Sequence, residues 1–419
     1  MEAQPSLQAT EQGRWLARLE QEQENLRAAL TWLLAQARGG GGQSKQQAER
    51  ALRFCAALSW FWYIRGYSRE GQAFLEQALA LRESVSVPGM AKAFYTAADL
   101  AFLLDDPERA DRLGSESLHL FRELGDKVGT ADALFLLGTS AWAKGEYMAA
   151  QPQLEEAASL YQEMGEQWKR GRCLTQLARI STVQGEYDQA QGLLEQSLAL
   201  YRSLGDKERL GWVLYLLARL LFLSRRDLTQ ARNLTEQSLT LLQEIDDPWE
   251  RAYPLVLLGQ ITLQRDDQTQ ARDLFEESRS SFKEVGDQAG MAEALIGLAS
   301  VAAMQGDFVA ARDLYQEIFP ILQRIQYQEL IPSCLEALAT VTAEQGQPVQ
   351  AAHLWGSSEA LREAIGTPIP PVYRPGYQQT VAAARSKLGE EDFATAWGQG
   401  RSMSPEQAMV VRTTQQPAN

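Results

Sequence analysis

Cysteine and histidine are scarce in this chain of 419 residues. It contains three cysteines, at positions 55, 173 and 334, and only two histidines. An odd number of widely separated cysteines, with no Cys-x-x-Cys pair, argues against a disulfide framework and against a zinc site. Because each cysteine stands in an apolar helical pattern, we expect buried thiols in a reducing cytoplasm. The sequence predicts no metal and no other cofactor.

Positive charge and long apolar runs are also lacking. The chain has 54 acidic and 40 basic residues, so its formal net charge is -14. Such a chain is not expected to be drawn to nucleic acid phosphates or to anionic membranes. No run of about 18 uncharged apolar residues occurs, and residues 1–20 contain no apolar stretch with a cleavage site. We therefore expect a cytoplasmic protein that neither spans a membrane nor binds nucleic acid directly.

Motifs that carry chemistry are missing as well. The sequence has no His-x-x-x-His, no Gly-x-Ser-x-Gly and no carboxylate-rich metal loop. The run GGGGQSK at 39–45 resembles a phosphate-binding loop, but Ser44 replaces its second glycine and Gln46 replaces its hydroxyl residue. A helical pattern precedes this run where a buried strand is required. We interpret the run as a flexible linker, and we expect a protein that is not an enzyme.

An internal repeat is what the sequence does contain. The phrase GEYMAAQPQLEEAASLYQEMGE at 145–166 aligns with GEYDQAQGLLEQSLALYRSLGD at 185–206, and six further copies keep this register. A small residue marks each copy at steps of 39 to 41 residues: Gly71, Ala110, Ala150, Ala190, Ala231, Ala271, Ala311 and Ala351. A fixed period in this range predicts stacked structural units rather than one globular core.

Each unit contains two segments with helical periodicity. In the first, Ala131, Leu134 and Gly138 fall on one helical face, and in the second Ala190, Leu194 and Tyr201 do the same. Between them stand turns such as GEY, GDF or RDD, and LGD or VGD closes the unit. Glycine ends a helix readily because it accepts positive φ, and an acidic residue suits the N-terminus of the next helix. The pattern predicts a helical hairpin in every unit.

These residues resemble the tetratricopeptide repeat. Leu-x-x-Leu-Gly/Ala in one helix, followed by Gly-Glu/Asp-Tyr/Phe-x-x-Ala, is the order of that family, although its ordinary unit has about 34 residues and this one about 40. The longer unit, with LGD in place of a terminal proline, is similar to the sensor regions of bacterial signal-transduction (STAND) ATPases and of LuxR-type activators, including the maltose-activator kind. The resemblance covers residues 45–366. It implies a right-handed α-solenoid superhelix of about eight helical hairpins.

The ends of the chain are expected to cap this solenoid, because the outermost repeats would otherwise expose apolar faces. TPIPP at 367–371 breaks the helical pattern, and short amphipathic helices are expected after it. We predict an N-terminal capping helix and Gly-rich linker at 1–43, eight repeats at 44–366, and a C-terminal helical cap with a flexible tail at 367–419.

The resemblance also implies candidate ligand contacts, since tetratricopeptide superhelices present the first helix of each unit to their concave side. Counting back from the turn glycine gives aromatic, arginine and aspartate residues concentrated in the first five or six units. The candidates are Trp60, Tyr63, Tyr95, Asp99, Phe102, Phe135, Trp142, Arg172, Arg179, Trp212, Tyr215, Arg219, Phe222 and Tyr253. Aromatic side chains and the planar arginine fork are frequent in binding grooves. Arg179 and Arg219 occupy the same place in adjacent units, where they would straddle one anionic group.

Two functions remain open at this point. One is a regulatory module, the sensor arm of a STAND or LuxR-type regulator, that binds a peptide, a partner protein or a small effector in its concave groove. The other is a structural scaffold or self-association module whose interior aromatics are packed and whose arginines pair with acidic neighbours. Homo-oligomer formation is open under both hypotheses.

Overall fold

The computed structural model of this chain describes residues 18–39, 43–81, 86–104, 106–245, 248–325 and 327–410. Over these ranges the chain forms helices and turns and contains no β-strand, which confirms the all-α prediction. No helix within the same ranges is long and apolar enough to cross a bilayer. Gly40 to Gly42 of the predicted linker lie outside the described residues.

The chain divides into two compact units. The first comprises residues 1–142 and 148–166, and the second comprises 143–147 and 167–419. Helices of the first unit are α2 (Gln23–Arg38), α3 (Ser44–Ile64), α4 (Ser68–Leu79), α5 (Val87–Leu103), α6 (Pro107–Leu124), α7 (Lys127–Ala143) and α8 (Tyr147–Glu163), the last two reaching its boundary. The predicted division at residues 43 and 366 stays a prediction.

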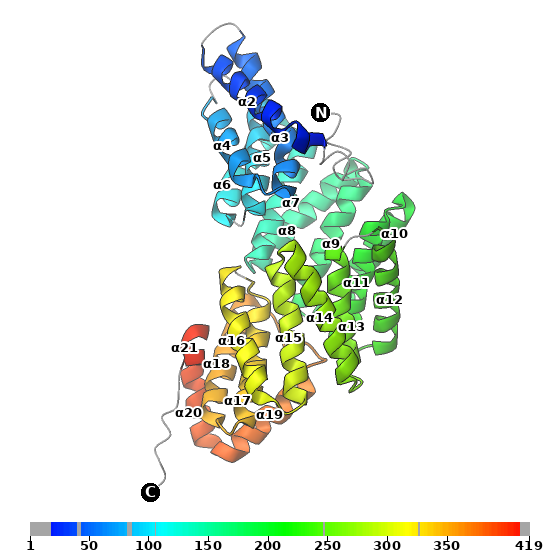
Figure 1. Ribbon diagram of the computed structural model, residues 1–419, viewed down its shortest axis with the longest axis vertical. Coiled ribbons are helices and arrows are strands. Elements are labelled where there is room, and N and C mark those ends of the chain that lie inside the picture. Colours follow the sequence, from blue (N-terminus) through cyan, green and yellow to red (C-terminus); the bar gives the residue numbers. More distant parts are fainter. Residues whose placement is uncertain are drawn as a thin grey trace. The chain divides into compact units, whose positions relative to one another are not determined.

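Helices of the second unit continue the same alternation. They are α9 (Gln167–Val183), α10 (Tyr187–Leu204), α11 (Lys207–Leu223), α12 (Leu228–Ile245), α13 (Pro248–Leu263), α14 (Gln268–Val285), α15 (Gln288–Met304), α16 (Phe308–Arg324), α17 (Leu330–Glu344), α18 (Pro348–Ile365), α19 (Arg374–Leu388), α20 (Glu390–Arg401) and α21 (Pro405–Val410). Within each unit, consecutive helices pack as neighbours, for example α5 with α6 and α11 with α12 (Figure 1). This arrangement confirms the predicted helical hairpins.

Helix ends follow the turn chemistry that the sequence predicts. Asp206 precedes α11, and its Oδ1 accepts a hydrogen bond from the backbone N–H of Arg209 at 3.0 Å, which satisfies a donor that has no partner inside the helix. Equivalent aspartate caps begin α6, α14, α15 and α16. Glycine in the left-handed region ends α6, α10, α14 and α18. The hairpin boundaries therefore arise from local residues.

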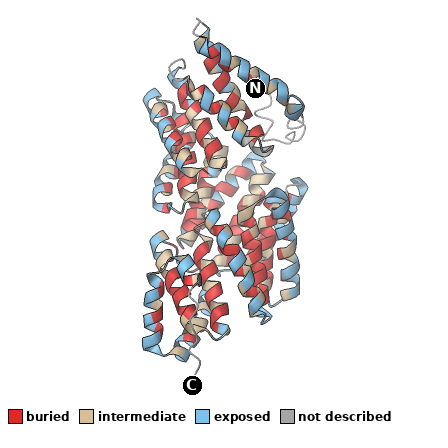
Figure 2. Ribbon diagram, turned by 60° about the vertical axis from the view of Figure 1, so that its left-hand side comes forward, coloured by how far each residue is buried: buried red, intermediate tan, exposed pale blue. Residues whose placement is uncertain are grey.

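Small residues and serines join the two helices of each hairpin. The alanines of the repeat register, from Ala110 to Ala351, are buried. Some second helices also carry a serine whose hydroxyl donates to a carbonyl of the preceding first helix, as Ser238 does to Gly211 at 2.7 Å. Four other serines form the same bond: Ser117, Ser197, Ser278 and Ser358. Figure 2 shows the buried residues running along the faces where helices meet.

The last repeat helix, α18, is covered by the helices that follow it. It packs against α19, α20 and α21, and its Trp355 is fully buried. Two glycines allow the close crossing with α20, because a Cβ at Gly356 would stand 2.2 Å from the Trp397 carbonyl oxygen, and one at Gly400 would stand 2.2 Å from that of His353. These contacts cover a helix that would otherwise present an apolar face to water.

Candidate binding site

In the first unit, the candidate residues lie on the first helices of hairpins, as expected. Tyr95, Asp99 and Phe102 belong to α5, and Phe135 and Trp142 belong to α7; all five are half-buried. Trp60 and Tyr63 are positions of α3 whose side chains lie outside the described residues. These residues give the first unit an aromatic face of intermediate exposure.

In the second unit, Arg172 of α9 is exposed and lies against an indole ring. Its guanidinium carbon is 5.3 Å from the centroid of Trp168. The Trp168 Nε1–H in turn donates to Asp206 Oδ2 at 2.8 Å, so the aspartate that caps α11 also fixes this ring. A cation held over an indole face is stabilised by the ring's quadrupole. Arg172 therefore has a defined position on the surface.

Tyr215 and Phe222 of α11 are core residues. Their side chains are only 4% and 1% exposed, and both belong to the apolar cluster formed around α10, α11 and α12. Burial raises the pKa of the Tyr215 phenol above its ordinary range. These two residues therefore support the surface of α11 from the core and are not themselves exposed.

Trp212 and Tyr253 join α11 to α13 through aromatic contacts. The Trp212 ring is 5.5 Å from Tyr253 in an edge-on arrangement and stacks on Trp249 at 6.3 Å. Trp249 Nε1–H and the Tyr253 hydroxyl both donate to Asp287 Oδ2, at 2.6 and 2.8 Å. Asp287 caps α15 as Asp206 caps α11. The same aspartate thus ends one turn and orients two aromatic side chains.

Arg219 of α11 forms an ion pair that reaches across 110 residues. Its Nη2 donates to Glu329 Oε1 at 2.8 Å, and the two side chains are 18% and 12% exposed. Glu329 is the N-cap residue of α17 but makes no capping hydrogen bond with its side chain. Burial is the largest single effect and lowers the pKa of Arg219, but Glu329, Tyr215, Glu293 and Tyr327 together raise it, and the pKa stands well above its usual value.

A second carboxylate, Glu293 of α15, is buried in the same region. It accepts a hydrogen bond from the Tyr327 hydroxyl at 3.3 Å. Burial raises the pKa of Glu293, and Arg219 partly offsets this effect. Burial also raises the pKa of Tyr327 well above its ordinary range, and both glutamates add to the increase. The inner side of the second unit thus combines buried aromatic rings with two carboxylates and an arginine.

Arg179 and Arg219 line one small cavity, and the expectation that they straddle one anionic group stays a prediction. Thr182, Leu194 and Leu216 complete its lining, and the accessible space is about 10 Å³. That volume accommodates roughly one water molecule. Arg179 also donates from Nη1 to Gln176 Oε1 at 3.0 Å. The cavity is of a size to take one polar group and not a whole ligand.

Counting along the repeat places Glu293 at a groove position, but the sequence analysis missed four other residues of this region: Glu329, Tyr327, Trp249 and Asp287. For Tyr327 and Glu329, the sequence did contain a signal, which is a departure from the repeat in the turn before α17. Ile325, Gln326 and Tyr327 stand where other units have Leu/Val-Gly-Asp, so Tyr327 replaces the capping aspartate. A unit that breaks a local rule is where a tertiary or functional constraint is expected. The break frees this turn to supply the partners of Arg219 and Glu293.

The described side chains are suited to recognition. Among them, no group of three or more His, Cys, Asp or Glu residues is arranged to hold a metal ion. Burial raises the pKa of the Cys55 and Cys334 thiols to about 12, so both remain protonated near neutral pH and are poor nucleophiles. Planar charge, aromatic area and paired carboxylates instead fit a peptide or an anionic group.

Comparison with known families supports the repeat assignment. The tetratricopeptide repeat family matches residues 172–244 and 250–324, and the family of soluble NSF attachment protein, SNAP, matches residues 23–201. No curated protein matches the chain. The chain therefore carries tetratricopeptide repeats, as the resemblance implied.

Solved structures show the same fold at low sequence identity. A Rap protein complexed with competence and sporulation factor is 13% identical, with a TM-score of 0.59 over 86% of this chain and 99% of that one. The Rap conjugation gene regulator of plasmid pLS20, in complex with the Phr* peptide, is 10% identical, with a TM-score of 0.58 over 81% and 95%. Aspartyl phosphate phosphatase F from Bacillus subtilis is 13% identical, with a TM-score of 0.56 over 67% and 74%.

Proposed function

We propose that this tetratricopeptide-repeat chain is a sensor or regulatory arm that binds a peptide segment of a partner along the first helices of its second unit. It acts in the cytoplasm, without chemistry of its own, as part of a STAND or LuxR-type regulator. The likeness to two Rap proteins solved with a signalling factor and with a peptide supports this proposal. Repeat proteins suit such a role because each unit contacts its neighbours, so that small rotations add up along the chain.

The ion pair between Arg219 and Glu329 is the observation on which the proposal rests most. Arg219 lines the cavity together with Arg179, and its one side-chain hydrogen bond in the described chain goes to Glu329. An arginine fork has five donors and accepts a second carboxylate readily. An acidic side chain or the C-terminal carboxylate of a peptide would therefore bind the remaining donors of Arg219 in competition with Glu329.

Selection from a displayed peptide library on the full chain tests this proposal. Enriched peptides should carry an acidic group, and Arg179→Ala with Arg219→Ala should weaken them by about tenfold or more, since a charged hydrogen bond contributes roughly 1.5–3 kcal/mol. Arg279→Ala is the matched control, because this exposed arginine lies on the second helix α14 and pairs, within the described part of the chain, only with its neighbour Glu276. Circular dichroism checks that every variant is folded.

The scaffold hypothesis predicts a different outcome of the same experiment. If the interior is only packed, no acidic peptide is enriched, and the arginine variants behave like the control. Light scattering would then show a dimer that depends on concentration and that C-terminal substitutions disrupt. Burial of Tyr215 and Phe222 is the feature that favours this alternative.

A further inference from the structure

The segment that follows the last repeat returns to two first helices of the second unit, α9 and α11. Residues 367–373, hereafter the strap, run without helical structure between α18 and α19 and contain three prolines. They meet the C-terminal ends of α9 and α11, which belong to repeats about four and three units earlier in the chain. A Cβ placed on Gly185, just after α9, would stand 2.9 Å from Cγ of Pro368. The strap therefore covers the C-terminal ends of α9 and α11 on one side.

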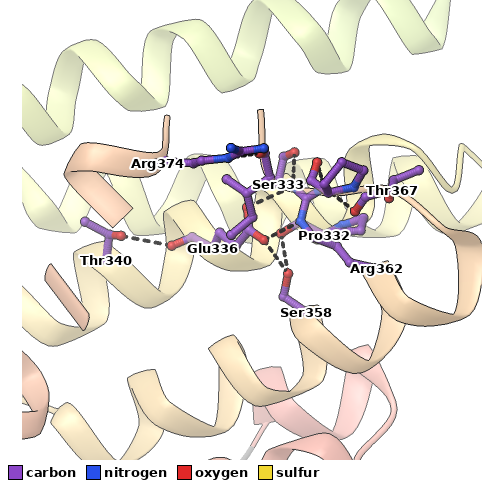
Figure 3. A network of polar contacts seen from close by, with 10 residues as sticks. Pro332, Ser333, Glu336, Thr340, Ser358, Arg362, Thr367 and Arg374 are labelled. Atoms are coloured by element: carbon purple, nitrogen blue, oxygen red, sulfur yellow. Dashed lines mark hydrogen bonds and ion pairs between the residues drawn. The ribbon is translucent and has the colours of Figure 1, made fainter. Parts of the chain in front are cut away.

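Arg362 holds the beginning of the strap. Its Nη1 donates to the carbonyl oxygens of Thr367 and Pro368, each at 3.4 Å, while Nε and Nη2 bind Glu336 (Figure 3). Arg374 Nε donates to the Ile369 carbonyl oxygen at 2.7 Å, and the Tyr373 N–H donates to the Pro370 carbonyl oxygen at 3.0 Å. The N-terminal part of the strap is thus fixed by one side chain of the last repeat, Arg362, and by one of α19, Arg374.

The other end of the strap is seated on α11 through few contacts. The Val372 N–H donates to the Leu223 carbonyl oxygen at 3.1 Å, and the Val372 side chain, 7% exposed, belongs to the α11 core cluster. Leu223 is the last residue of α11, where helix carbonyls lack partners inside the helix. The Tyr373 ring lies edge-on to Phe222 at 6.1 Å. One backbone bond, one buried side chain and one ring contact form this seat.

The seat lies beside the polar region described above. Partial removal of the Tyr373 hydroxyl from water raises its pKa to about 12, although 38% of the residue is exposed, and Arg219 lowers this pKa whereas Glu293 raises it. Phe222 and Arg219 are neighbours on the same helix, so a segment on the seat approaches the cavity that Arg179 and Arg219 line. A peptide that extends along α11 would meet the strap.

We propose that the strap is an internal occupant of the peptide site, and that the partner segment carries the same chemistry: proline followed by an aliphatic and an aromatic residue. This inference rests on the proposed function and names its partner class. Prolines reduce the entropy lost when such a segment is ordered, so a short sequence binds through few contacts. An internal copy raises the local concentration of the competing segment and keeps the seat closed until a partner displaces it.

A labelled synthetic peptide with the sequence of residues 367–374, TPIPPVYR, tests the proposal by fluorescence polarisation on the full chain. Val372→Asp places a charge in the buried seat and should release the internal copy. We expect the probe to bind this variant at least tenfold more tightly than wild type. Val309→Asp, on a residue 66% exposed in α16, is the control and should behave as wild type. Equal affinity for wild type and Val372→Asp, or binding to neither, would overturn the proposal.

If circular dichroism shows that the Val372→Asp variant is unfolded, a milder variant tests the same proposal. Val372→Ala with Tyr373→Ala removes the apolar anchor and the ring contact without adding charge, and the same gain in probe binding is expected. Hydrogen exchange at the residue 372 amide should be slow in wild type and faster in the double variant. An unchanged exchange rate and unchanged probe affinity would refute strap release.

The proposal that the strap occupies the peptide site and the proposal that Arg179 and Arg219 bind an acidic peptide can be rejected separately. TPIPPVYR carries no acidic side chain, and with its C-terminus amidated it offers Arg179 and Arg219 no carboxylate. On the Val372→Asp chain, Arg179→Ala with Arg219→Ala should therefore weaken an acidic library peptide more than the amidated probe, because only the acidic peptide loses charged hydrogen bonds. Loss of library enrichment with retained probe binding would reject the anionic contact alone.

Discussion

Two arginine–glutamate pairs of the second unit draw their carboxylates from the same helix region, yet they are built differently. Glu336 of α17 pairs with Arg362 of α18, and Glu329, at the N-cap of α17, pairs with Arg219 of α11. Their side chains are almost equally covered, at 10% and 12% exposure for the first pair and 18% and 12% for the second. Burial alone does not separate them.

Hydrogen bonding does separate the two pairs. Arg362 uses all three guanidinium nitrogens, on Glu336, the Ser333 hydroxyl and two strap carbonyls, and Ser358 also donates to Glu336 (Figure 3). Among the described residues, Arg219 makes one side-chain hydrogen bond, to Glu329, and it lines a cavity. A saturated network fixes structure, whereas an unsaturated arginine retains donors for a ligand. The contrast supports a structural role for Arg362 and agrees with the recognition role that we propose for Arg219.

The largest expected effect comes from Arg362→Ala. It leaves Glu336 buried without its cation and frees the strap, so we expect the free energy of unfolding to fall by about 3–5 kcal/mol. Urea denaturation of the full chain measures the change. The double variant Arg362→Met with Glu336→Leu should recover most of the loss, because it removes both charges. A loss below about 1 kcal/mol would show that the network carries little stability.

Arg219→Ala is expected to cost less stability than Arg362→Ala. One charged hydrogen bond is lost, which corresponds to roughly 1.5–3 kcal/mol, whereas Glu336 would lose the two nitrogens Nε and Nη2 of Arg362. The same urea titration reports this value, with Arg279→Ala expected within about 0.5 kcal/mol of wild type. If Arg219→Ala proved as damaging as Arg362→Ala, the distinction between the two pairs would disappear.

Glu329→Gln sharpens the comparison from the other side. It removes the internal carboxylate from Arg219 but keeps the side-chain volume, so acidic peptides selected on the wild type should bind about tenfold more tightly, or about 1.4 kcal/mol. Isothermal calorimetry measures the affinity. Glu336→Gln is the matched variant and should leave peptide affinity unchanged, since Arg362 remains engaged by Ser333 and the strap carbonyls.

The smallest effect is a pH dependence at Glu293. Burial raises the pKa of this carboxyl above its ordinary value of 4.5, so the folded chain holds the proton more tightly than the unfolded chain. Protonated Glu293 therefore contributes stability that is fully present below pH 4.5 and is lost as pH rises through the raised pKa. Gln does not titrate, so the unfolding free energy of wild type minus that of Glu293→Gln should fall as pH rises through this window. Urea titrations at stepped pH measure both values. A constant difference would show that the carboxyl is not perturbed by folding.

The spacing of the repeats predicted which helices carry part of the candidate site. Arg179 and Arg219 stand at equivalent positions in adjacent units, and they line one cavity, while the anionic group that they would straddle stays a prediction. The same arithmetic placed Tyr215 and Phe222 among the groove residues, although both are core side chains. Repeat position indicates which helix a residue lies on, but the burial of each side chain depends on the neighbours that α10, α12 and the strap supply.

Local sequence by itself determined the helices, their caps and the hairpin repeat. Aspartate and glycine act on the few backbone groups next to them, and a period of about 40 residues returns the same small residue to each crossing. Tertiary structure alone decided that Glu329 reaches Arg219, 110 residues away, and that Val372 is seated on Leu223. Such contacts depend on rotations that accumulate over several repeats, and no short-range pattern in the sequence encodes their sum.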